Sequence, residues 1–142
     1  MQKIKIKRKL QDFFPVISQA LELKERIILF VGRFSPEKQP LVFVLAIYQL
    51  LKLQATNFKV VMAGDGPEYH KVKSLITELK LEGYITLPGS QTSAQVKDWM
   101  TVADILTMTS STEGTPLVTL EALSMGLAIV APNVGGISCK LF

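Results

Sequence analysis

The sequence has little of the two side chains that most often carry nucleophilic or metal chemistry. It holds one cysteine, Cys139, and one histidine, His70, among 142 residues. A single cysteine excludes an internal disulfide and a cysteine-rich metal site, and it fits a reducing, cytoplasmic setting. His70 follows Glu68 and Tyr69 in a polar stretch with no nucleophile signal nearby. We therefore expect an exposed helix histidine, and we expect neither a metal nor a cofactor.

Long apolar runs and a basic surface are also missing. No run approaches the roughly 18 residues of a membrane-spanning helix, and the first nine residues are too basic for a secretory signal. The chain has 16 basic and 12 acidic residues. Five of those positive charges lie in the first ten residues, at Lys3, Lys5, Lys7, Arg8 and Lys9. The rest is close to neutral, so binding to nucleic acid is not expected.

Short apolar runs alternate with segments of helical length along the rest of the chain. The runs predict strands over 27–31, 59–63, 84–87, 105–108 and 128–131, and the segments between them predict helices over 40–53, 67–81, 92–100 and 116–124. Pro40, Pro67 and Pro116 suit first helical positions. Such alternation predicts an α/β fold with a doubly wound, Rossmann-like parallel sheet covered by helices on both faces.

Glycines follow most of the predicted strands. Each alone is more simply a turn glycine, but together at one sheet edge they favour a shared ligand surface: Gly32, Gly64, Gly66, Gly89 and Gly114. The segment from Gly64 to Glu68 is not a dinucleotide fingerprint, since Tyr69 holds the third glycine position. Apolar residues on the helices are taken as core contacts, among them Leu117, Leu120, Leu123, Val42, Leu45, Ala46 and Tyr48.

The segment from Glu113 to Gly126 is the strongest candidate for ligand chemistry. A glycine loop enters a helix at Pro116, so free backbone N–H groups from Thr115 to Val118 form an anion site suited to phosphate. Glu113 precedes this helix and Glu121 lies on it, and both carboxylates are candidates for accepting hydrogen bonds from sugar hydroxyls. The alternative is an ordinary loop acid and an exposed helix acid.

A second candidate segment follows the first predicted strand. Arg33 comes directly after Gly32 at a strand end, and Lys38 follows across a short turn. The two cations can converge on a diphosphate and offset its charge without a metal ion. The alternative is a pair of solvated surface charges.

These segments, in this order, resemble the donor-binding C-terminal domain of the GT-B fold glycosyltransferases of family 4, the group 1 glycosyltransferases. The resemblance covers residues 26–137. Its most specific element is Glu113 and Glu121 with seven residues between them, followed by the runs Gly126–Ala131 and Val134–Ile137.

The resemblance implies a role for each matching residue. Arg33 and Lys38 match the cationic pair on the donor diphosphate, and act as electrophilic catalysts of leaving-group departure. Glu113 matches the acid on the donor sugar, and Glu121 the acid on the ribose. The backbone of Gly114, Thr115, Pro116, Leu117 and Val118 would bind the distal phosphate, and the Leu87–Gly89 loop would border the base. Such enzymes generally retain anomeric configuration, need no metal, and use a UDP- or GDP-linked sugar.

The chain also departs from the family pattern. Gln39 takes a place usually given to glycine, and Thr115 a place that is usually aromatic. After Ile137 the family continues with a further strand and closing helices, and an acceptor-binding N-terminal domain normally precedes this one. We therefore expect residues 26–142 to form a nucleotide-sugar-binding domain without its final strand and helices, in a truncated chain whose acceptor, lipid-linked or polysaccharide, meets the missing domain.

Two other functions stay open at this point. A nucleotide-sugar 2-epimerase shares the fold and the donor geometry, but acid–base groups for it cannot be placed. A non-catalytic nucleotide-binding fragment is the other.

We expect residues 1–25 to form a basic arm with a leading helix. We expect an interdomain linker, because the arm precedes the first strand where such a connection must run. The alternative is peripheral contact with anionic lipid at the cytoplasmic membrane face, which would be sensitive to salt.

Overall fold

The computed structural model of the chain describes residues 25–111 and 117–132. Five parallel strands form one sheet: β1 (Arg26–Val31), β2 (Phe58–Ala63), β3 (Ile85–Gly89), β4 (Ile105–Thr107) and β5 (Ala128–Val130). Their order across the sheet is β3-β2-β1-β4-β5. The order reverses between β1 and β4, which is where open α/β sheets place their ligands.

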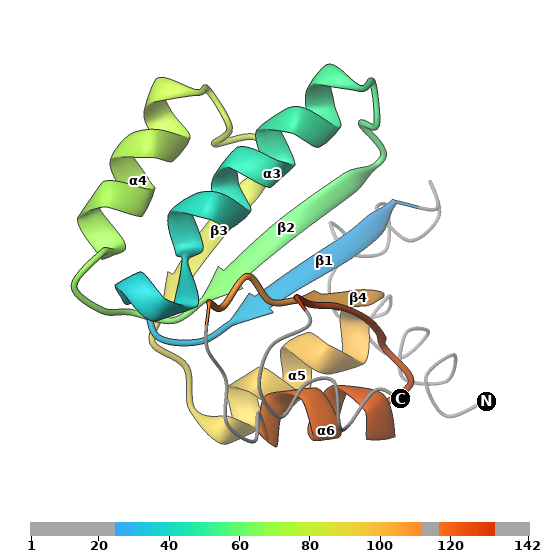
Figure 1. Cartoon of the computed structure of the whole chain (residues 1–142). Coiled ribbons are helices and arrows are strands. Elements are labelled where there is room, and N and C mark those ends of the chain that lie inside the picture. The colour runs from blue at the N-terminus through green and yellow to red at the C-terminus, as the bar shows by residue number, and fades with distance from the viewer. Residues whose placement is uncertain (1–24, 112–116, 133–142) are drawn as a thin grey trace.

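Helices cover both faces of the sheet, as the sequence predicts (Figure 1). On one face lie α3 (Pro40–Lys52) and α4 (Tyr69–Glu78), and on the other lie α5 (Ser93–Val102) and α6 (Leu117–Ser124). A short 3-10 helix, η1 (Pro36–Lys38), connects the end of β1 to α3. The doubly wound α/β fold expected from the sequence is confirmed.

The core is divided by the sheet into two layers. Phe30, Phe43 and Met62 belong to the layer under α3 and α4, whereas Leu29 and Leu106 belong to the layer against α5 and α6. Successive residues of β1 therefore bury their side chains on opposite faces, and this explains why the strand is an unbroken apolar run. Burial on both faces makes β1 the rigid centre from which the loops at its carboxyl end extend.

Several element bounds differ from the predicted ones. The strand expected to close before Pro88 continues through Pro88 and Gly89. A proline is tolerated there because β3 is the edge of the sheet, where a missing N–H need not pair with a neighbour. The helix expected from Pro67 begins at Tyr69. The helix expected at Thr92 uses that residue as its N-cap, with a capping box to Gln95.

The prediction that the outer apolar residues of the helices are core contacts is wrong for most of them. On α6 the exposed fractions of Leu117, Leu120 and Leu123 are 68%, 38% and 41%. On α3 those of Val42 and Leu45 are 48% and 46%. Both helices are apolar on more than one side, so the periodicity of apolar residues does not show which side faces the sheet. The side that is buried includes Phe43 and Ile47 on α3, and Thr119 and Ala122 on α6.

Candidate functional site

A pocket of about 280 Å³ lies at the carboxyl ends of β1, β2 and β3. We call it the strand-end pocket. Three consecutive loops supply its walls, and β1 itself borders the point at which the strand order reverses. The lining residues are Val31, Gly32, Arg33, Ala63, Gly64, Asp65, Ser90, Gln91 and Val96.

Arg33 owes its position to the residue that follows it. The side chain of Phe34 is fully buried and stacks on Tyr69, with ring centroids 5.8 Å apart. Its backbone N–H donates to the Asp65 carbonyl at 3.0 Å, and its carbonyl accepts from the Glu68 N–H at 2.8 Å. Because Phe34 is fixed on three sides, the neighbouring Arg33 is directed outward and lies exposed at the pocket.

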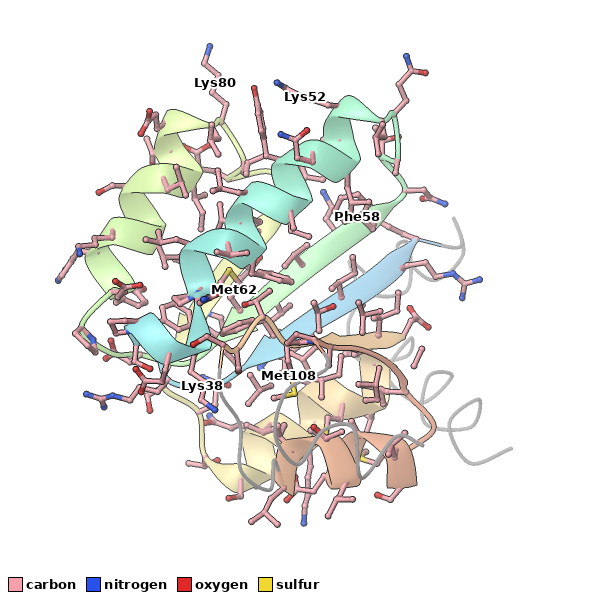
Figure 2. All side chains as sticks on the ribbon, viewed as in Figure 1. Lys38, Lys52, Phe58, Met62, Lys80 and Met108 are labelled. Atoms are coloured by element: carbon pink, nitrogen blue, oxygen red, sulfur yellow. The ribbon has the colours of Figure 1, made fainter. Side chains whose placement is uncertain are left out.

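Lys38 reaches the same end of the sheet through η1. Figure 2 shows it near the end of β1, at the opposite end of α3 from Lys52. The hydroxyl of Thr109, just after β4, donates to the carbonyls of Lys38 and Gln39, each at 2.9 Å. The backbone N–H of Ser111 donates to the Glu37 carbonyl at 2.8 Å. These bonds hold the loops after β1 and β4 together across the reversal point.

Glu37 lies close to both cations. The pKa of its carboxyl is lowered, first by a hydrogen bond from its own backbone N–H and further by the positive charges of Arg33 and Lys38. The carboxylate therefore stays ionised well below neutral pH. The positive charges of Arg33 and Lys38 make the smallest contributions to this lowering of the pKa.

Three of the glycines at the strand ends, Gly32, Gly64 and Gly89, lie close together. The Gly64 N–H donates to the Gly89 carbonyl at 2.9 Å. A Cβ atom on Gly64, whose φ is +155°, would lie 1.9 Å from the Gly32 carbonyl oxygen. Only glycine allows the loops after β1 and β2 to approach each other this closely. Gly32 and Gly64 both line the strand-end pocket at this contact.

Besides Val31 and Ala63 at the strand ends, sequence reasoning missed four residues that line the pocket. Asp65 lies in the loop after β2, and its carboxylate accepts from the Gly66 N–H at 2.7 Å. Ser90 and Gln91 follow β3, and Val96 lies on α5. The signal was available for Ser90 and Gln91, because they directly follow Pro88 and Gly89 at a strand end.

The remaining predicted site residues belong to the segment before and within α6. Leu117 and Glu121 are exposed, and Val118 is half-buried against the second core layer. Glu113, Gly114, Thr115 and Pro116 lie outside the described residues, so their predicted roles stay predictions.

Within residues 25–111 and 117–132, no group of three or more histidine, cysteine, aspartate or glutamate side chains could hold a metal ion. No helix in the same ranges is long and apolar enough to cross a membrane. His70 is exposed on α4, as predicted.

The exposed Arg33 and a loop-walled pocket thus lie at the carboxyl edge of a doubly wound sheet, where proteins of this fold class bind their ligands. This is the architecture of an α/β domain with a ligand pocket at its strand ends. The family model described as glycosyl transferases group 1 matches residues 15–139, and the chain belongs to this family.

Two curated relatives and one solved structure illustrate the similarity. A UDP-Gal:α-D-GlcNAc-diphosphoundecaprenol α-1,3-galactosyltransferase from Escherichia coli is 30% identical over 92% of this chain. An α-1,4-N-acetyl-D-galactosaminyltransferase from Campylobacter jejuni, whose name gives an undecaprenol-linked substrate, is 37% identical over 70% of this chain. The Anabaena protein HepE, solved with UDP and glucose, superposes with a TM-score of 0.71 and 26% identity over 87% of this chain.

The chain spans only part of each relative. It covers 36% of the length of the galactosyltransferase, 27% of the N-acetylgalactosaminyltransferase and 34% of HepE. These neighbours are glycosyltransferases of the GT-B fold, so the resemblance read from the sequence is confirmed at the level of family and fold.

Proposed function

We propose that the chain is the nucleotide-sugar-binding domain of a retaining, metal-independent glycosyltransferase. The observation that supports the proposal is the strand-end pocket with the exposed Arg33 in its wall. The loop that carries both Arg33 and Lys38 is bonded to the loop after β4 across the reversal point. Two cations at this edge suit the diphosphate of a sugar donor, and the pocket beside them suits a nucleoside.

Each predicted residue has a place in this proposal. Arg33 and Lys38 hold the diphosphate, Glu121 accepts from the ribose, and Glu113 accepts from the donor sugar. The backbone of residues 114–118 binds the distal phosphate. Gly32, Gly64 and Gly89 line or border the pocket for the base, where a side chain would take up the space of the ligand.

The proposed chemistry needs no acid or base from the described residues to start. The bond between the anomeric carbon and the diphosphate oxygen breaks, and the electron pair leaves with the diphosphate. An acceptor hydroxyl then forms the new bond on the same face and gives its proton to the departing diphosphate oxygen. Arg33 and Lys38 stabilise the charge that develops on the leaving oxygen, which lowers the barrier in the way an oxyanion site does.

The proposal for the acceptor is based on the names of the relatives. Both curated relatives carry a lipid-linked acceptor or substrate in their names. We propose a lipid-linked or polysaccharide acceptor bound by a separate N-terminal domain, with residues 1–25 as the connection to it, in the cytoplasm. Peripheral contact of this basic arm with the membrane is the alternative use of the same residues.

The proposal is tested by titrating UDP into the full chain by calorimetry, with EDTA present. We expect weak binding to the wild type, and affinities about 10- to 100-fold lower for Arg33→Ala and Lys38→Ala, because each substitution removes a charged partner worth about 1.5–3 kcal/mol. Lys52→Ala is the matched control, since Lys52 lies at the far end of α3.

Equal affinities for the wild type and both variants, or a strict requirement for magnesium, would overturn the assignment.

The transferase and the 2-epimerase differ in their product. The comparisons favour the transferase, because the relatives described above are named for glycosyl transfer. Incubating the longer protein with a donor and looking for an epimerised nucleotide sugar without acceptor tests the epimerase directly.

A further inference from the structure

We propose that Gln91 and Trp99 form a positioning pair that holds the Pro88–Gln91 loop in the shape that reads the base of a nucleoside diphosphate. The inference deepens the proposed function and rests on it. It concerns a wall of the strand-end pocket to which the sequence assigned no side chain. Neither residue is a catalytic residue, because both act through the loop.

The amide of Gln91 makes three polar contacts at once. Its Oε1 accepts from the indole Nε1–H of Trp99 at 3.1 Å. Its Nε2 donates to the Ser90 carbonyl at 3.1 Å and lies 3.4 Å from the Pro88 carbonyl. An indole only donates and a carbonyl only accepts, so one orientation of the amide satisfies all three partners.

The loop between β3 and α5 is therefore fixed at three points. Gly89 is held at the end of β3 through its hydrogen bond from Gly64. Thr92 is held as the N-cap of α5, where its hydroxyl accepts from the Gln95 N–H at 3.2 Å and its N–H donates to the Gln95 side chain at 2.9 Å. Gln91 ties the intervening residues to α5 through Trp99. A loop held in advance binds its ligand without the cost of ordering it.

Trp99 is a firm anchor for this arrangement. Its half-buried ring packs against the second core layer, beside buried residues such as Met100 and Leu106. Val96, one turn earlier on α5, lines the strand-end pocket. The indole N–H thus connects the core to the pocket wall through a single side chain.

The pocket wall faces the place where a base would lie. Ser90 and Gln91 line the pocket together with Arg33, which the proposed function assigns to the diphosphate. A ligand whose diphosphate meets Arg33 would extend its nucleoside toward this loop. A ligand without a base, such as inorganic pyrophosphate, would use the cations and leave the loop untouched. This difference makes the pair testable.

The test measures the affinities of UDP and of inorganic pyrophosphate for the full chain. For Gln91→Leu we expect UDP affinity to fall about tenfold, because the variant keeps the size of the side chain but loses all three polar contacts. Pyrophosphate affinity should stay within about twofold of the wild-type value. For Trp99→Phe, which keeps a ring and removes the donor, we expect a smaller loss in the same direction, and the double variant should be no worse than Gln91→Leu alone.

Thr101→Val is the matched control. It removes the hydrogen bond from the Thr101 hydroxyl to the Asp98 carbonyl on the same helix. None of the three points that fix the loop is changed, so the ratio of the two affinities should stay the same. Trp99 is the one tryptophan of the chain. Its fluorescence should therefore change when UDP binds and stay constant when pyrophosphate binds.

The outcomes separate the two proposals. If the wild type binds UDP and pyrophosphate but Gln91→Leu keeps the wild-type ratio, the positioning role is wrong and the proposed function stands. If Gln91→Leu loses both ligands equally, the residue is merely structural and the inference is again wrong. If the wild type binds neither ligand, the proposed function fails, and this inference fails with it.

Discussion

Gln39 adopts a backbone conformation that costs free energy for any residue with a side chain. Its φ and ψ are 49° and 53°, in the left-handed region. The residue is both the C-cap of η1 and the N-cap of α3, so the chain must turn sharply there. This geometry explains why glycine is usual at this place in the family that the sequence resembles.

We expect Gln39→Gly to stabilise the domain. The left-handed conformation costs a non-glycine residue about 1–2 kcal/mol, and the greater freedom of glycine in the unfolded chain offsets about 0.5–1 kcal/mol of the gain. The net increase in the free energy of unfolding should be about 0.5–1 kcal/mol, measured by denaturant titration. Gln39→Ala keeps the strain and should show no such gain. A glycine variant less stable than the alanine variant would contradict this explanation.

At the scale of the elements, the junction of β1 and β2 leaves no space for a side chain at Gly64. The two strands pair in parallel over six residues each, from Arg26 with Phe58 to Val31 with Ala63. Directly after the last pair, Gly64 passes the Gly32 carbonyl so closely that no Cβ atom fits. The floor of the strand-end pocket therefore depends on a backbone contact.

Gly64→Ala should destabilise the domain by about 3 kcal/mol, because the new methyl group collides with backbone that cannot move without breaking the sheet. Gly83→Ala is the matched control, since nothing lies within 4 Å of a Cβ atom there. Thermal unfolding of the two variants measures the difference. Similar melting temperatures for both would show that the loop after β2 can shift.

Most elements could be predicted from the sequence because their signals are local. Apolar runs closed by glycine or proline predict the strands, and Pro40 marks the start of α3. The end of β3 depends on its place at the sheet edge, and the buried stripe of α3 depends on which helix packs beside it. Neither property is local, so periodicity and turn residues do not reveal them.

The residues of the candidate site likewise fall into those that the sequence could predict and those that it could not. Arg33 and the glycines follow strands directly, so topology alone brings them to one edge. Phe34 and Gln91 act through Tyr69 and Trp99, partners that are close in space but not adjacent in the sequence. The residue types alone do not predict such pairs, because many other partners would satisfy an aromatic ring or an amide.

At the scale of the whole molecule, the helices among the described residues cover one face of the sheet only in part. An apolar groove of about 620 Å³ lies between α3 and the strands β4 and β5. Leu50 and Leu53 line it from the helix, and Ile105 and Val130 line it from the sheet. Leu53 is 78% exposed, and β5 is an edge strand. A continuous exposed apolar surface of this kind favours association.

Leu53→Glu should reduce the binding of a hydrophobic dye such as ANS and reduce self-association at high concentration. The charge lies at the mouth of the groove, and stability should change by less than about 0.5 kcal/mol because the side chain is already exposed. Leu120→Glu, on α6 at the opposite face, is the control and should leave most of the dye binding in place. Dye fluorescence and sedimentation measure both effects, and equal dye binding by the wild type and Leu53→Glu would contradict the assignment.

The bonds from Thr109 and Ser111 to the loop around η1 also bear on the order of folding. They join residues that are 71 and 74 positions apart in the chain. Contacts across such long separations form late, because closing a long loop costs entropy before any contact repays it. The paired strands β1, β2 and β3 can assemble first. The loop that carries Lys38 is fixed only later, when β4 and the residues after it have folded. During synthesis, the proposed diphosphate site would therefore be completed only after residue 111 has left the ribosome.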